Sequence, residues 1–114
     1  MRYIRTNDNE IYETTEYYML PLGYPEYRVK GSNKAFSEYT DVVKQADTIE
    51  ELCDEFVVIG KTTDDYSTYD NLNKALKFME LRGICRDRLR GAIWTDKGLI
   101  YVARMNNEGV MELL

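Results

Sequence analysis

The chain has 114 residues, of which 44% are hydrophobic and 31% charged, and its formal net charge is −5. This composition excludes disorder and predicts one domain, 1–114, while the lack of a long apolar stretch or signal core predicts a cytoplasmic protein. The chain contains no histidine, which removes the commonest general base and transition-metal ligand.

The first part of the chain reads as a series of short strands. Tyr3-Ile4 and Ile11-Tyr12 flank turn residues at 7–9 and predict a hairpin. The alternating segment 27–30 predicts another strand, and Val42-Val43 predicts a short one.

A first helix is predicted over 49–56. Thr48 and Glu51 have the spacing of a capping box, in which each side chain satisfies a free amide of the other's backbone. Ile49, Leu52, Cys53 and Phe56 then form one apolar stripe at helical spacing. The β-branched run 57–59, ended by a glycine, predicts a buried strand directly after the helix.

A second helix is predicted from Asp70 to Gly83, after the polar, turn-rich segment 61–71. Asp70 is a favourable N-cap and Gly83 a favourable C-terminal residue. Its inner face is predicted to hold Leu72, Ala75, Leu76 and Met79. Phe78 and Leu81 fall off this stripe and suggest a second apolar contact.

The C-terminal third predicts a three-stranded meander. Strands at 92–94, 99–105 and 110–113 are separated by turns at 95–98 and 106–109. The resulting fold class is α+β: a small antiparallel sheet, or a partly closed barrel, with two helices packed on one side.

Three segments are similar to known sequences. MRYIRT at the start, VVKQADTIEELCDEFVVI at 42–59 and GAIWTDKGLIYVARMNNEG at 91–109 resemble small accessory proteins of phages and prophages of Firmicutes such as Listeria, Enterococcus and Streptococcus. The resemblance implies a role inside the host bacterial cell and carries over no catalytic residue.

Charge is distributed unevenly along the chain. Residues 38–70 hold ten acidic side chains against two lysines, and residues 71–104 hold eight basic side chains against three acidic ones. Acidic groups interleaved with tyrosines can imitate nucleic-acid phosphates and bases, although such runs are also typical of solvated surface. The candidate partner-binding residues are Asp64, Asp65, Tyr66, Tyr69, Asp70, Glu50, Asp54 and Glu55.

One basic cluster stands out, made of Arg82, Arg86, Arg88 and Arg90. Guanidinium groups suit the binding of phosphates. The same residues could instead pair with the acidic region or complement the C-terminal end of the second helix.

No reaction centre is recognisable. Cys53 lies on the predicted buried stripe, and Cys85 has arginines as sequence neighbours but no histidine partner. We expect two free thiols, no enzyme activity, no cofactor and no metal.

The leading hypothesis is therefore a phage-encoded, non-enzymatic binding protein that inhibits or modulates a host nucleic-acid enzyme or defence system. Its sharpest form is an anti-CRISPR-type inhibitor of an RNA-guided nuclease, bound through the acidic, tyrosine-containing surface. The alternatives are direct nucleic-acid binding through the arginine cluster, and a structural homodimer joined through Phe78 and Leu81 or the last strand.

Overall fold

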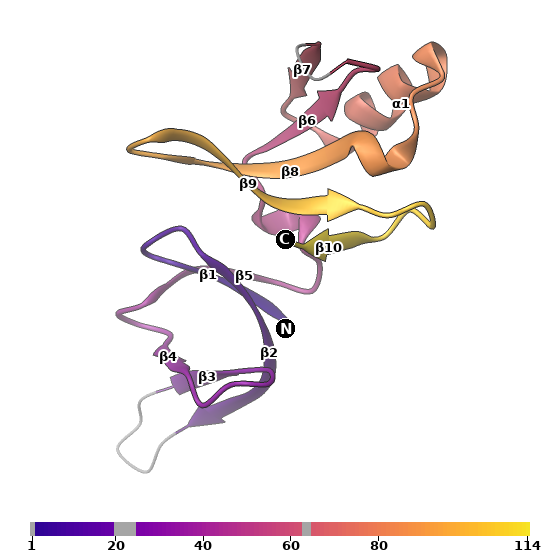
Figure 1. Ribbon diagram of the computed structural model, residues 1–114. Coiled ribbons are helices and arrows are strands. Elements are labelled where there is room, and N and C mark those ends of the chain that lie inside the picture. Colours follow the sequence, from indigo (N-terminus) through magenta and orange to yellow (C-terminus); the bar gives the residue numbers. More distant parts are fainter. Residues whose placement is uncertain (1, 20–24, 63–64) are drawn as a thin grey trace. The chain divides into compact units, whose positions relative to one another are not determined.

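The computed structural model describes residues 2–19, 25–62 and 65–114, and this part divides into two compact units, Met1–Leu52 and Cys53–Leu114. Each unit contains one five-stranded antiparallel sheet (Figure 1). The α+β class with predominantly antiparallel strands is confirmed, but the single sheet is wrong. Residues 55–59 pair with strands on both sides of them and so complete a second sheet with the C-terminal strands. The single domain stays a prediction.

The sheet of the first unit has the order β4-β3-β2-β1-β5. The predicted N-terminal hairpin is confirmed, with Ile4 opposite Tyr12 and with Asn9 at a positive φ of 64° in the turn. The predicted strands near 27–30 and 42–43 are also confirmed, whereas β4 was not predicted. The strands are β1 (Tyr3–Thr6), β2 (Ile11–Met19), β3 (Pro25–Val29), β4 (Ala35–Ser37) and β5 (Val42–Ala46).

Tyr27 of β3 belongs to the core of this unit. Its side chain is fully buried, its ring lies 4.9 Å from that of Tyr17, and its hydroxyl donates a hydrogen bond to Gln45 Oε1. Burial, with a smaller contribution from the charge of Glu38, raises the pKa of Tyr27 to about 12. In the folded protein the phenol of Tyr27 therefore stays neutral at pH values above its ordinary pKa of 10.0.

The first predicted helix is wrong. Residues 50–52 form only a short 3-10 turn, η1 (Glu50–Leu52), and strand β6 (Glu55–Ile59) begins where the helix was expected to continue. An isolated helix this short is marginal in water, whereas Phe56 and the β-branched residues after it pair with two neighbouring strands. The apolar stripe is therefore divided: Ile49 and Leu52 are buried in the first unit, and Phe56 in the second.

The sheet of the second unit has the order β10-β9-β8-β6-β7. The predicted C-terminal meander is confirmed by the antiparallel pairing of β9 with both β8 and β10. Strand β7 was predicted as loop. Each sheet ends in two edge strands in the described ranges, so the partly closed barrel is not confirmed. The remaining strands are β7 (Tyr66–Tyr69), β8 (Leu89–Thr95), β9 (Gly98–Met105) and β10 (Met111–Leu113).

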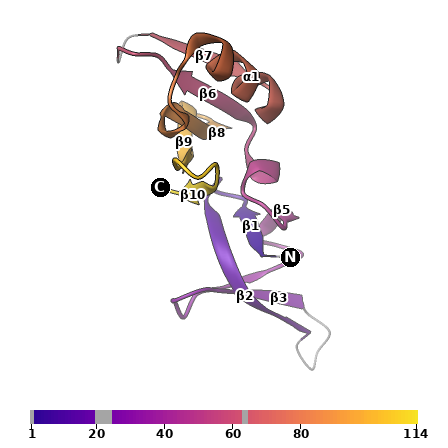
Figure 2. The same ribbon diagram turned by 90° about the vertical axis from the view of Figure 1, so that its right-hand side faces the viewer.

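The described residues contain one α-helix, α1 (Leu72–Arg82), which packs on β6 and β7 (Figure 2). The Asn71 side chain, not that of Asp70, caps its N-terminus by accepting from the amide of Asn73, and Gly83 ends it at a φ of 63°. Ala75 and Met79 are buried as predicted. A short 3-10 turn, η2 (Arg86–Arg88), leads into β8. No helix among the described residues is long and apolar enough to cross a membrane.

Candidate functional site

The second sheet has two faces of different character. One face is covered by α1, because the ring of Tyr69 lies 5.4 Å from that of Phe78 in the helix. Phe56 is directly opposite Tyr69 and therefore points to the same side. Side chains alternate along each strand, so their neighbours point to the opposite side, which we call the open face. The open face holds Tyr66 and Thr68 of β7, Glu55, Val57 and Ile59 of β6, Arg90, Ala92 and Trp94 of β8, Leu99, Tyr101 and Arg104 of β9, and Glu112 of β10.

Aromatic side chains on the open face are exposed. Tyr66 is 65% exposed, Trp94 53% and Tyr101 44%. Tyr101 and Arg104 lie three positions apart, yet share this face, because the register shifts between Gly91 and Ala92 and leaves Val102 unpaired. The irregularity therefore lines up an aromatic ring and a guanidinium group.

Trp94 is held in place by two carboxylates. Its backbone amide donates to Asp54 Oδ2 at 3.1 Å, and its indole N–H donates to Glu55 Oε1 at 2.8 Å. Exposed Asp96 lies in the adjacent turn. We call Asp54, Glu55, Trp94 and Asp96 the acidic tryptophan end. It offers a fixed, exposed indole with acidic side chains close to it in the structure and the sequence, a combination suited to a basic partner.

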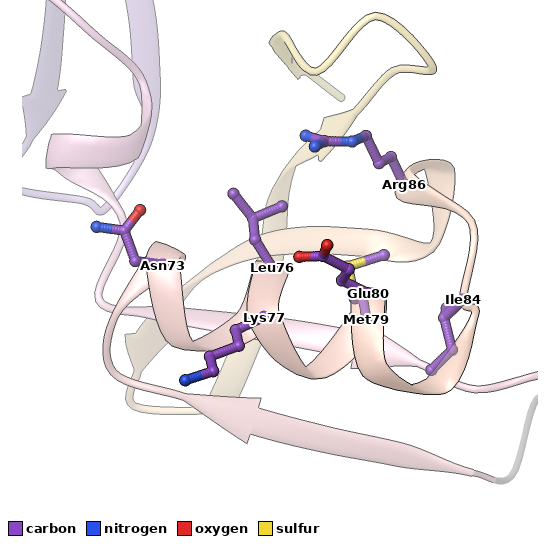
Figure 3. Close-up of a pocket in the computed structure, with 7 residues that line it drawn as sticks. All are labelled: Asn73, Leu76, Lys77, Met79, Glu80, Ile84 and Arg86. Atoms are coloured by element: carbon purple, nitrogen blue, oxygen red, sulfur yellow. The ribbon is translucent and has the colours of Figure 1, made fainter.

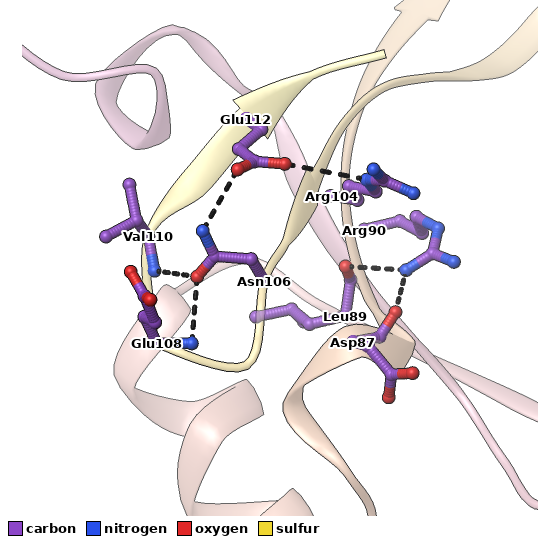
Figure 4. A network of polar contacts seen from close by, with 8 residues as sticks. All are labelled: Asp87, Leu89, Arg90, Arg104, Asn106, Glu108, Val110 and Glu112. Carbon is purple, nitrogen blue, oxygen red and sulfur yellow. Dashed lines mark hydrogen bonds and ion pairs between the residues drawn. The ribbon is translucent and has the colours of Figure 1, made fainter.

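The other end of the open face is basic. Arg90 and Arg104 are directly opposite each other in the register, and Figure 4 shows their guanidinium groups side by side. Arg104 Nε lies 3.7 Å from a carboxylate oxygen of Glu112. Arg90 Nη1 donates to the backbone carbonyl oxygens of Asp87 and Leu89. These carbonyl groups carry no net charge, so they do not neutralise the guanidinium. A hollow of about 260 Å³ lies here, lined by Asp87, Arg90, Arg104, Met105, Asn106 and Asn107.

The structure does not gather the predicted acidic tyrosine cluster on one surface. Tyr66 lies on the open face, but Tyr69 points to the opposite side and packs on Phe78. Asp65 is exposed, and Asp70 forms an exposed ion pair with Lys74 at 3.3 Å. Asp64 lies outside the described residues.

The other predicted acidic candidates are also separated. Glu50 belongs to the first unit, where it lies in η1, while Asp54 and Glu55 meet at Trp94 in the second. The structure therefore assembles two of the eight predicted residues around an aromatic side chain that sequence reasoning had not selected.

The predicted arginine cluster makes contacts with neutral groups. Arg82 lies over the Phe78 ring at 5.3 Å, Arg86 Nη1 contacts Met105 Sδ at 3.9 Å, and Arg88 Nη1 donates to the Gly60 carbonyl at 3.0 Å. No ion pair joins these three or Arg90 to a carboxylate in the described ranges. The alternative in which they pair with the acidic region is not observed.

A groove of about 620 Å³ runs along α1 (Figure 3), lined by Asn73, Leu76, Lys77, Met79, Glu80, Ile84 and Arg86. Its lining carries mixed charge, from Lys77, Glu80 and Arg86. Among the described residues, no set of three or more Cys, Asp or Glu side chains could hold a metal ion, and Cys53 and Cys85 are not joined by a disulfide. Leu81, a predicted dimer contact, is 75% exposed, whereas Phe78 is half-buried.

Trp94, Tyr101 and Arg104 were not selected from the sequence. The predicted strands 92–94 and 99–105 contain all three, and alternation along a hairpin gives a signal for Trp94. No sequence pattern revealed the shift in register that brings Tyr101 and Arg104 to one face. No family model matches the chain, and no match was found among curated proteins or among solved structures.

Proposed function

We propose that this chain is a non-enzymatic binding protein that docks its acidic tryptophan end onto a basic surface of another protein. The single observation that carries the proposal is the half-exposed indole of Trp94, fixed by Asp54 and Glu55. Tryptophan is the residue type most enriched among the residues that dominate binding energy. A side chain fixed before binding loses little entropy when a partner covers it.

The charge of this end indicates the chemistry of the partner. Glu55 accepts from the indole N–H, Asp54 accepts from the backbone amide of Trp94, and Asp96 and Lys97 lie in the adjacent turn. A basic nucleic-acid channel is a surface of matching charge, and its field would accelerate association. With the resemblance to phage and prophage accessory proteins, this supports a host nucleic-acid enzyme as target, with inhibition of an RNA-guided nuclease as the sharpest form.

The experiment is a cleavage assay with a purified RNA-guided nuclease from a Firmicutes host, after capture of host proteins on the immobilised chain. The wild-type chain is expected to inhibit cleavage, less strongly as salt increases. Trp94→Ala is expected to weaken inhibition by about 30-fold, the loss typical of a dominant interface residue. Glu55→Lys is expected to abolish the salt dependence as well as weaken binding.

Tyr39→Ala is the matched control, because Tyr39 is an aromatic residue of the first unit with 71% exposure. Asp65→Lys tests the acidic tyrosine cluster separately. The proposal is refuted if Trp94→Ala captures the same proteins and inhibits as strongly as the wild type. Equal losses in Trp94→Ala and Tyr39→Ala would also refute it, because they would show that the effect does not depend on this surface.

A further inference from the structure

The open face carries an unusual arrangement of charge at its basic end. Arg90 and Arg104 form a directly opposed cross-strand pair, in which like charges destabilise a sheet. Glu112 lies against Arg104 only, at 3.7 Å from Nε, and its other carboxylate oxygen accepts from the Asn106 amide at 3.0 Å. The pair therefore keeps an excess of positive charge that an anion would neutralise.

The guanidinium groups are positioned before any ligand binds. Two backbone carbonyls accept from Nη1 of Arg90, which fixes the plane of its guanidinium group. The described residues offer no acceptor to Nε and Nη2 of Arg90 or to the two terminal nitrogens of Arg104. These donors adjoin the hollow of about 260 Å³. Paired guanidinium groups match the oxygens of a phosphate, to which each can donate two parallel hydrogen bonds.

An aromatic side chain lies next to the pair of Arg90 and Arg104. Ala92, two positions after Arg90, is opposite Tyr101, so the exposed tyrosine ring is in the next cross-strand row on the same face. Phosphate binding beside an exposed ring on a flat sheet is the arrangement by which proteins bind single strands, whose bases stack on aromatic side chains. A duplex keeps its base faces covered and offers no such stacking.

We infer that Arg90, Arg104 and Tyr101 form a binding site for a single-stranded nucleic acid, with a phosphate held between the two arginines and a base on the tyrosine. The exposed carboxylate of Asp87 lines the same hollow and limits the affinity for anions. The site differs from the predicted arginine cluster, of which it uses only Arg90. It is independent of the acidic tryptophan end and therefore of the proposed protein partner.

The test is a fluorescence-anisotropy titration of the full chain with a labelled ten-nucleotide oligothymidylate at low salt. Arg90→Gln and Arg104→Gln are each expected to weaken binding about tenfold, the loss typical of one charged hydrogen-bonding partner. The double variant is expected to reduce the slope of log affinity against log salt by about 0.7, because the one phosphate held between the two arginines is no longer neutralised. Tyr101→Ala is expected to weaken binding about tenfold, and Tyr101→Phe to retain it, because the phenyl ring still stacks.

Arg82→Gln is the matched control, since Arg82 is an arginine of the predicted cluster that lies on the helix side, over Phe78. Arg104→Gln removes an exposed charge from a like-charge pair, so circular dichroism should show a folded protein of unchanged or higher stability. The inference is overturned if Arg82→Gln weakens binding as much as Arg104→Gln does. It is also overturned if a duplex of the same length binds as tightly, or if inorganic phosphate binds as tightly as the oligonucleotide, which would indicate a site for small anions only.

Discussion

Gly91 allows close packing of three side chains in the second unit, and its replacement tests that packing directly. A Cβ atom added at Gly91 would lie 2.5 Å from Cys53 Sγ, 3.1 Å from Met111 Cε and 3.4 Å from Ala103 Cβ. Ordinary contact begins at about 3.5 Å, so the clash with sulfur amounts to about 1 Å. Gly91→Ala is expected to lower the free energy of unfolding by about 2 kcal/mol, within the range for overpacked cores. Without the clash, the substitution would stabilise the protein slightly by restricting the unfolded chain.

The assay is urea denaturation of four proteins: the wild type, each single variant and the Gly91→Ala/Cys53→Ala double variant. Because Cys53→Ala removes the sulfur, the cost of Gly91→Ala is expected to fall below about 1 kcal/mol in that background. Met111 Cε is the end of a flexible side chain and can move aside. A further double variant, Gly91→Ala/Cys85→Ala, is the control: it changes the exposed cysteine instead and should give no rescue. An equal cost of Gly91→Ala in the wild-type and Cys53→Ala backgrounds would refute the reasoning.

Three further predictions concern other parts of the fold. The pKa of Tyr27 is raised from 10.0 to about 12, so the stability that its neutral phenol contributes is complete below pH 10 and is lost as the pH rises toward 12; by linkage the loss is about 3 kcal/mol. Tyr27→Phe should therefore lose less stability between pH 9 and pH 12 than the wild type in urea titrations, and identical pH profiles would contradict the assignment. Asn71→Ala should lower the unfolding free energy by about 1 kcal/mol through loss of the helix cap, while Asn71→Asp should retain most of it; equal losses would exclude capping as the cause. Trp94 is the only tryptophan, and its indole N–H bonds to Glu55. Acrylamide should therefore quench tryptophan fluorescence more strongly in Glu55→Ala than in the wild type, whereas the control Glu112→Ala should leave quenching unchanged.

The local elements with strong turn and capping signals were predictable from the sequence. The C-terminal meander follows from turns at 95–98 and 106–109, and the second helix from its apolar spacing and from Gly83. The failure over 49–56 has a physical cause. In a short helix, a capping box and one apolar stripe leave many backbone hydrogen-bonding groups without partners. In β6, which lies between two strands, the backbone groups form hydrogen bonds on both sides.

The candidate site was less predictable than the fold. Asp54 and Glu55 were selected for their charge. Their contact with Trp94, however, depends on the pairing of β6 with β8, because Asp54 and Trp94 are 40 positions apart in the sequence. The pairing of Arg90 with Arg104 likewise requires the exact register of β8 and β9. Tyr66 and Tyr69 were predicted to act together because they are close in sequence, yet strand β7, predicted as loop, turns them to opposite faces.

The unpaired Val102 has a genetic consequence. Deletion of its single codon would remove the bulge and leave a regular β-hairpin that can still close at 95–98, with Tyr101 still opposite Ala92 and Ala103 still opposite Gly91. Tyr101 and Arg104 would then lie two positions apart, so regular alternation would keep both side chains on the open face. An in-frame loss of three nucleotides would thus preserve both a folded product and the place of the Tyr101 ring beside the arginine pair.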